Sequence, residues 1–197
     1  MLDVSRETLD RLKAFEALVL KWTPKINLIS KKDQADIWGR HILDSLQVAE
    51  CGEPCDHWVD IGSGGGFPGI VLAVYAREYW PKTRFTLIES DQRKCTFLRT
   101  SIRELDLNVT VLSQRIEEAP PQNADILSAR ALADLDTLLG FADRHLSTAG
   151  FALFQKGESW QKEVEDARKS WRFKCEAVKS HTHDSAVILK IEGVSRD

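Results

Sequence analysis

The segment Asp60-Ile61-Gly62-Ser63-Gly64-Gly65-Gly66-Phe67-Pro68-Gly69 decides the fold, because it joins a short apolar run, residues 58–61, to a longer one, residues 70–76. A run that is apolar on every side is typical of a buried helix. Glycines allow a chain to turn sharply out of a strand and let its backbone approach a ligand, and proline suits a first helical position. The segment therefore predicts a strand, a ligand-binding turn and a buried helix, an arrangement found at the carboxyl ends of strands in open α/β sheets.

Short apolar runs and helical stripes alternate through the following sequence. Strands are predicted at residues 85–88, 109–112, 125–127 and 150–154, and helices between them around residues 95–105 and 135–146. Strands separated by helices form a mostly parallel sheet that is covered on both faces. Two last runs, residues 173–178 and 186–191, are joined by about seven residues, which is too short for a crossover helix. They predict an antiparallel hairpin at one edge of the sheet.

The first part of the chain is helical. A stripe from Leu12 to Trp22 at helical spacing predicts one helix, which we expect to end at Pro24. A second stripe predicts another helix at about residues 34–49. Glycine and proline within residues 51–55 indicate a connection. We therefore expect an N-terminal helical cap, residues 1–52, that forms one domain with an α/β core, residues 53–197.

Composition excludes several classes of protein. The 197 residues carry 27 Lys and Arg against 30 Asp and Glu, a net charge of −3, which excludes a globally basic nucleic-acid binder. No apolar run approaches the roughly 18 residues that span a membrane, and no signal stretch is visible. With four scattered cysteines, a cytoplasmic protein is expected. Cys51 and Cys55 lack zinc-finger spacing and His181 and His183 stand alone, so we assign no metal; a monomer is the default.

The glycine spacing fits two kinds of ligand. The glycines within residues 64–69 satisfy the dinucleotide fingerprint, with Glu89 20 residues further on. Gly62, Gly64 and Gly66, after the acidic Asp60 at the end of the first strand, instead resemble the S-adenosylmethionine loop of class I methyltransferases. A carboxylate at Asp60 would repel a pyrophosphate, but it attracts, directly or through water, the cationic methionine end of S-adenosylmethionine. Asp60 therefore favours a methyltransferase over a nicotinamide-dependent oxidoreductase.

Two further segments fit the adenosine part of such a donor. Glu89, at the end of the second strand of the core, can accept hydrogen bonds from both ribose hydroxyls; the alternative is a solvated acid at a helix N-terminus. Residues 115–117, after the third strand, lie where adenine is expected. Ile116 offers a backbone N–H and an apolar contact, and Glu117 can accept a hydrogen bond from the exocyclic amine.

Basic residues gather in two parts of the chain. Residues 21–32 contain four lysines and no acid. Five other basic residues lie in the cap or near the predicted carboxyl ends of strands: Arg40, Arg93, Arg115, Arg130 and Lys156. We expect these groups around one crevice that binds RNA phosphates, although Lys31 and Lys32 fit a solvated helix end equally well. Because an unpaired buried guanidinium is unfavourable, Arg130, after an apolar strand, is predicted to bind the cofactor or a phosphate.

Together these features resemble one family over nearly the whole chain: the bacterial 16S rRNA guanine-N7 methyltransferases, also called glucose-inhibited division protein B. Besides the glycine loop, the resembling segments are Trp22, Asn27-Leu28-Ile29-Ser30, Arg40-His41-Ile42-Leu43-Asp44-Ser45-Leu46, Ser128-Ala129-Arg130-Ala131 and Lys156-Gly157. The Phe-Pro-Gly-Ile ending of the loop and the Arg-His-Ile-Leu-Asp-Ser segment are more specific than glycines alone. One departure is Gln155, where the family commonly has leucine or another apolar residue.

The resemblance implies a class I S-adenosylmethionine-dependent methyltransferase with a Rossmann-like fold. Its implied reaction is transfer of the methyl group of S-adenosyl-L-methionine to N7 of a guanine in 16S rRNA, guanine 527, in the free RNA or in the small ribosomal subunit. The family's cofactor positions fall here on Gly62, Phe67, Ile116 with Glu117, and Arg130.

Guanine N7 carries a free lone pair and no proton, so the implied reaction needs no general base. Positioning of the two reactants then supplies the catalysis. We expect no acid–base residue, and Asn27, His41, Arg130 and Lys156 are candidates for positioning the substrate. For His41, a structural hydrogen bond with Asp44 is the alternative. Three other functions stay open: a methyltransferase acting on a small molecule, an NAD-dependent oxidoreductase, and an RNA-binding module without turnover.

Overall fold

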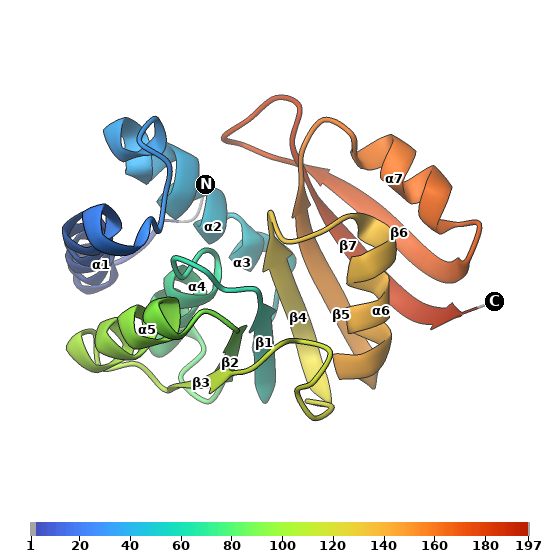
Figure 1. The fold of residues 1–197 in the computed structure, drawn as a ribbon, viewed down its shortest axis with the longest axis horizontal. Coiled ribbons are helices and arrows are strands. Elements are labelled where there is room, and N and C mark those ends of the chain that lie inside the picture. The colour runs from blue at the N-terminus through green and yellow to red at the C-terminus, as the bar shows by residue number, and fades with distance from the viewer. Residues whose placement is uncertain (1–2, 197) are drawn as a thin grey trace.

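The structure, a computed structural model, describes residues 3–196 and confirms the mostly parallel α/β sheet with a hairpin at one edge (Figure 1). Its strands are β1 (His57–Ile61), β2 (Arg84–Glu89), β3 (Val109–Ser113), β4 (Ala124–Arg130), β5 (Leu146–Lys156), β6 (Trp171–Lys179) and β7 (Val187–Arg196). They lie in the order β3-β2-β1-β4-β5-β7-β6. The first five strands are parallel, β7 pairs antiparallel with β5, and β6 pairs antiparallel with β7 at the edge.

Helices cover both faces of this sheet, as Figure 1 shows. One face carries α4 (Gly69–Tyr79) and α5 (Gln92–Glu104), and α1 (Arg6–Ile26) packs on both. The other face carries α6 (Leu135–His145) and α7 (Trp160–Ala167), which contact each other. Each face has its own apolar core. The sheet is therefore buried on both sides, and its strand ends are left to form a site.

The cap differs from the expected pair of helices. Pro24 does not end α1, because the helix continues to Ile26 and closes with the left-handed residue Asn27, whose N–H donates to the Thr23 carbonyl. Proline lacks one N–H, which removes a single helical hydrogen bond and leaves the last turn in place. The expected helix at residues 34–49 consists of short pieces instead: η1 (Asp33–Asp36), η2 (Trp38–Leu43), α2 (Asp44–Leu46) and α3 (Val48–Cys51).

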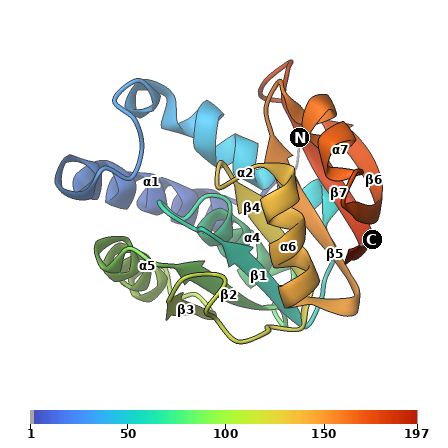
Figure 2. The same cartoon turned by 45° about the vertical axis from the view of Figure 1, so that its right-hand side comes forward.

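The middle piece, η2, is a π-helix. At the junction of η1 and η2, the Asp36 carboxylate accepts a hydrogen bond from the Gly39 N–H at 3.0 Å. Single π-turns are frequent at functional sites. Figure 2 shows these cap pieces above the strand ends, near the turn that joins β6 to β7. Within residues 3–196, none of the helices has the length and apolar character needed to cross a membrane.

Candidate active site

The glycine loop between β1 and α4 makes the sharp turn that its sequence predicts. Gly62, Gly64 and Gly66 have φ values of +64°, +52° and +85°, a region that side chains disfavour. The Gly62 N–H donates to the Ile88 carbonyl at 2.9 Å, which holds the loop against β2. A Cβ on Gly62 would lie 2.5 Å from Leu132, whereas a Cβ on Gly64 would meet only the Gly62 carbonyl oxygen, at 3.7 Å. The loop is therefore packed at Gly62 and open at Gly64.

Asp60 lies beneath this loop and is 0% exposed. Its Oδ1 accepts a hydrogen bond from the Ser128 hydroxyl at 2.7 Å, and that hydroxyl in turn accepts from the Trp58 indole N–H at 2.9 Å. Its Oδ2 lies under Gly69, where an added Cβ would come within 2.7 Å. Burial raises the pKa of Asp60 from 3.8 to about 7, against the opposing effect of the Ser128 hydroxyl. Near neutral pH this carboxyl is therefore poised between its neutral and charged forms.

Glu89 ends β2 and joins the loop to the start of α5. Its Oε2 accepts from the Gly64 N–H at 2.9 Å and its Oε1 from the Asp91 N–H at 2.8 Å. Each carboxylate oxygen has a second lone pair, so both can still accept a hydroxyl. The solvated-acid alternative does not describe Glu89, which is only 8% exposed. Asp91 is instead the residue that caps α5.

The predicted adenine segment follows β3. Ile116 is buried, and its carbonyl accepts a hydrogen bond from the ring of the buried His145 at 3.0 Å. The next residue, Glu117, is exposed. The segment thus has one fixed apolar residue and one solvated acid.

His41 and Phe67 meet between the cap and the loop, with ring centroids 4.8 Å apart. The His41 Nε2 lies 3.6 Å from the Asp33 carboxylate, and neither ring nitrogen hydrogen-bonds to any residue in the range 3–196. The alternative of a hydrogen bond with Asp44 is therefore wrong, because the ring turns towards Phe67. Burial, with the nearby Arg130 charge, lowers the pKa of His41 from 6.5 to about 4, so the ring is neutral at pH 7.

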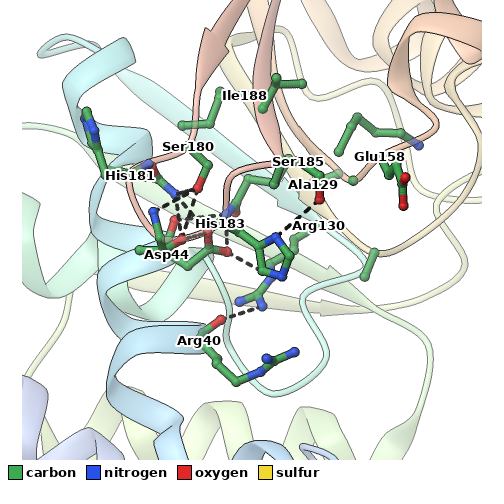
Figure 3. A pocket seen from close by; sticks show the side chains of 18 of the residues that line it. Arg40, Asp44, Ala129, Arg130, Glu158, Ser180, His181, His183, Ser185 and Ile188 are labelled. Atoms are coloured by element: carbon green, nitrogen blue, oxygen red, sulfur yellow. Dashed lines mark hydrogen bonds and ion pairs between the residues drawn. The ribbon is translucent and has the colours of Figure 1, made fainter.

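A cavity of about 760 Å³ lies at the carboxyl ends of β4 and β5, between the cap and the β6–β7 turn (Figure 3). Arg130, at the end of β4, lines it. The guanidinium Nε lies 3.4 Å from the Asp44 carboxylate, and Nη2 donates to the Arg40 carbonyl at 2.7 Å. The third nitrogen, Nη1, is buried and has no hydrogen-bond partner among the described residues. The two N–H donors of Nη1 are thus unpaired and shielded from solvent.

Lys156, at the end of β5, lines the same cavity but is already engaged. Its ammonium donates to the Ala133 carbonyl at 2.9 Å and pairs with the Glu163 carboxylate at 2.5 Å. Because Glu163 lies on α7, a helix that the sequence patterns did not predict, this pairing was not foreseen.

The basic residues do not form the expected single crevice. Arg40, Arg130 and Lys156 line the large cavity. Asn27, Lys25, Lys31 and Arg93 instead line a separate hollow of about 290 Å³ beside the end of α1. Lys21 lines a third hollow beside Trp22, and the exposed Lys32 and Arg115 line none of the three. The sequence therefore identified the basic residues but not their distribution.

Comparison with known proteins identifies the family. The family model described as rRNA small subunit methyltransferase G matches residues 8–190. The chain belongs to this family. A curated relative, ribosomal RNA small subunit methyltransferase G of Ruegeria sp., is 60% identical over 99% of this chain and 95% of its own length.

Solved structures agree with the fold. A TehB-like SAM-dependent methyltransferase from Corynebacterium glutamicum has a TM-score of 0.59 and 13% identity, over 92% of this chain and 98% of that one. The M. jannaschii protein TYW2 in complex with AdoMet has a TM-score of 0.61 and 16% identity, over 81% and 77%. The chain has the class I, Rossmann-like methyltransferase fold.

Two polar residues of this methyltransferase G family member were not predicted as site residues. Asp44 lies in the cap segment used for the resemblance, and Gln155 was noted only as a departure from the family. In the structure the Gln155 amide donates to the Asp44 carboxylate at 2.7 Å, and both residues line the large cavity. A buried polar side chain at the end of an apolar strand is the signal that points to such a contact.

Proposed function

We propose that this protein transfers the methyl group of S-adenosyl-L-methionine to N7 of a guanine in 16S rRNA, guanine 527 in the family's numbering of its target. The observation that carries the proposal is one juxtaposition: an open glycine loop over the buried carboxyl of Asp60, beside a cavity that holds Arg130. We further propose that residues 1–52 act as a cap on the core, residues 53–197, and close this cavity from one side.

The residues around the loop fit the proposed cofactor. The open position at Gly64 leaves room for a ligand against the backbone, with the packed Gly62 and the buried Phe67 on either side of it. The charged form of Asp60 attracts the cationic methionine end through the loop. Glu89 accepts from the ribose hydroxyls with the lone pairs that its two backbone contacts leave free.

The adenine and carboxylate ends have matching groups. Ile116 supplies an apolar contact and a backbone N–H, and Glu117 accepts from the exocyclic amine. The free Nη1 of Arg130 is suited to an anionic group of the cofactor or of the RNA, because its other nitrogens are already held. When bound, the cofactor supplies an electrophilic methyl group on a sulfonium.

The proposed acceptor lies in the cavity next to Arg130. Its volume of about 760 Å³ accommodates a nucleotide, and Arg130 and Lys156 line it and are placed to orient the base. His41 lies outside this lining, against Phe67, and is the third proposed positioning residue. Guanine N7 has no proton to lose, so none of these side chains has to act as a base. The neutral state of His41 is consistent with a positioning role. Alignment of the two reactants supplies several of the roughly 7–11 kcal/mol that orientation provides in ideal cases.

The test is incubation of the protein with methyl-labelled cofactor and two substrates, naked 16S rRNA and small subunits that lack the modification. Digestion and mass spectrometry of the nucleosides should give N7-methylguanosine, and fragment mapping should place it at one position. Label on a different atom would refute the N7 assignment. Label in small metabolites with none in RNA would favour a small-molecule methyltransferase. Calorimetry that shows NAD binding without binding of S-adenosylhomocysteine would favour an oxidoreductase.

A further inference from the structure

The Asp44 carboxylate joins four parts of the chain at the wall of the large cavity (Figure 3). Its Oδ1 accepts from the Gln47 amide at 2.8 Å and from the Thr182 hydroxyl at 2.7 Å. Its Oδ2 accepts from the Gln155 amide at 2.7 Å and lies 3.4 Å from the Arg130 guanidinium. These donors come from the cap, the β6–β7 turn, β5 and β4, so one side chain fixes the relative positions of all four.

The β6–β7 turn depends on these contacts for its position. The turn forms much of one cavity wall, with Ser180, His181 and Thr182 among its lining residues. The Ser180 hydroxyl accepts from the Gln47 side-chain amide at 3.0 Å, and the His181 backbone N–H donates to the Gln47 side-chain Oε1 at 2.8 Å. The turn residues 181–185 are exposed or half-buried, so no packed apolar side chain among them anchors the turn. Polar contacts with the cap fix its position instead.

Asp44 also sets the direction of the Arg130 side chain. The guanidinium is held at Nε by Asp44 and at Nη2 by the Arg40 carbonyl, which leaves Nη1 free. Without the carboxylate, this mostly buried cation would lose its nearest negative charge and its orientation. The Asp44 side chain is only 15% exposed, and its four acceptor positions are occupied. It therefore acts on its neighbours and is not itself open to a substrate.

Gln155 shares this role in this chain. Its Nε2 donates to both the backbone carbonyl and the carboxylate of Asp44, at 2.9 Å and 2.7 Å. Its Oε1 is buried and has no hydrogen-bond partner in the described part of the chain. A buried amide oxygen without a partner is unfavourable. The two hydrogen bonds that Nε2 donates must therefore be what holds the Gln155 side chain in this orientation. The contact with Asp44 explains a polar residue at the end of an otherwise apolar strand.

We propose that Asp44, supported by Gln155, is a positioning residue for the acceptor: it holds the β6–β7 turn and Arg130 around the cavity in which the RNA base is methylated. This inference rests on the proposed function for the identity of the acceptor. The arrangement of turn and guanidinium rests on the contacts alone.

The experiment exchanges the carboxylate of Asp44 and the amide of Gln155 between the two positions. Asp44→Asn places an amide N–H₂ opposite two donors, from Gln155 and Arg130, and should lower kcat/KM for 16S rRNA at least tenfold. The double variant Asp44→Asn/Gln155→Glu restores a carboxylate that accepts from the new amide and faces Arg130, but it gives up the hydrogen bond to the backbone carbonyl of residue 44 and should recover part of that loss. Asp166→Asn, at an exposed ion pair with Lys169 near the end of α7, is the matched acid-to-amide control and should leave kcat/KM unchanged.

Hydrogen exchange provides a readout that does not require turnover. Amides at residues 180–186 should exchange faster in Asp44→Ala, which removes the acceptor for the Thr182 hydroxyl and the Gln47 amide, with the β1–β3 amides unchanged. In Asp44→Asn they should stay near the wild-type rate, because the Oδ1 of the new amide still accepts from both donors. A wild-type kcat/KM in Asp44→Asn, or a loss that the double variant leaves unrepaired, would overturn the proposal. So would unchanged exchange at the turn in Asp44→Ala. Failure of the wild-type protein to methylate 16S rRNA would instead refute the proposed function, and the exchange result would still stand.

Discussion

Replacement of Asp60 by asparagine should remove a pH dependence from cofactor binding. In the cofactor-free protein, burial holds the pKa of Asp60 at about 7, so below pH 7 the carboxyl is mainly protonated. A bound cation above the loop favours the charged form, so binding must release the proton. If binding returns the pKa to its ordinary value of 3.8, affinity should rise about tenfold between pH 6 and pH 8 and then level off.

Calorimetry can measure both quantities. Titration of the cofactor in buffers of different ionisation enthalpy should show about 0.9 protons released at pH 6 and about 0.1 at pH 8. Asp60→Asn should bind with little proton release at either pH. The variant also provides a baseline: any protons that the cofactor's own amine takes up or releases on binding are the same for both proteins and cancel in the comparison. Equal wild-type affinity at pH 6 and pH 8, or a tenfold change that survives in the variant, would refute the link between Asp60 and the cofactor.

The same shift predicts a change in stability. Because the folded-state pKa lies above the unfolded value, the stabilising contribution is complete below pH 3.8 and is lost as the pH rises to about 7. A shift of roughly three units corresponds to about 4 kcal/mol of unfolding free energy. Thermal unfolding without cofactor should show this loss between about pH 4 and pH 7 in the wild type. The corresponding decrease should be absent in Asp60→Asn.

Three further outcomes test the site. Glu89→Ala removes the acceptor for the Gly64 N–H and for two hydroxyls, and should weaken cofactor binding roughly a hundredfold by calorimetry. His41→Ala should change single-turnover methyl transfer by less than about tenfold, because no base is needed; complete loss with RNA and cofactor still bound would contradict that reasoning. RNA affinity should fall steeply with salt, and Lys25→Ala or Lys31→Ala should each reduce the log–log slope by about 0.7; a flat response would exclude phosphate contacts there.

The part of the fold that local sequence determines was predicted. The sequence around Asp60 places positive-φ glycines directly after an apolar strand, and few other structures satisfy both requirements. The short connection before residue 186 leaves only a hairpin, which the antiparallel pairing of β6 and β7 confirms. Helix α7 was missed although Trp160, Val164 and Ala167 recur at helical spacing, because the stripe is short and surrounded by charges.

The contacts that complete the cavity could not be predicted in the same way. Burial correctly indicated that Arg130 needs partners, but Asp44 lies far from it in the sequence. The contacts of Asp44 with Gln155 and Thr182 span 111 and 138 residues. These contacts form only when the β6–β7 turn folds back onto the cap. Neither hydrophobic periodicity nor a sequence motif predicts contacts between residues so far apart in the sequence. The local sequence thus identifies Arg130 as a buried charge, and only the tertiary structure shows that Asp44 is the acid that pairs with it.

The distribution of charge suits the proposed reaction. Methyl transfer from a sulfonium to N7 moves a positive charge onto the purine, and a strongly cationic wall would oppose that movement. Around the large cavity, Arg130 faces Asp44, Lys156 pairs with Glu163, and His41 is neutral. Lys25 and Lys31, at the separate hollow, have no carboxylate within 4 Å among residues 3–196. Phosphate attraction is therefore available away from the reacting atoms, where it does not raise the barrier.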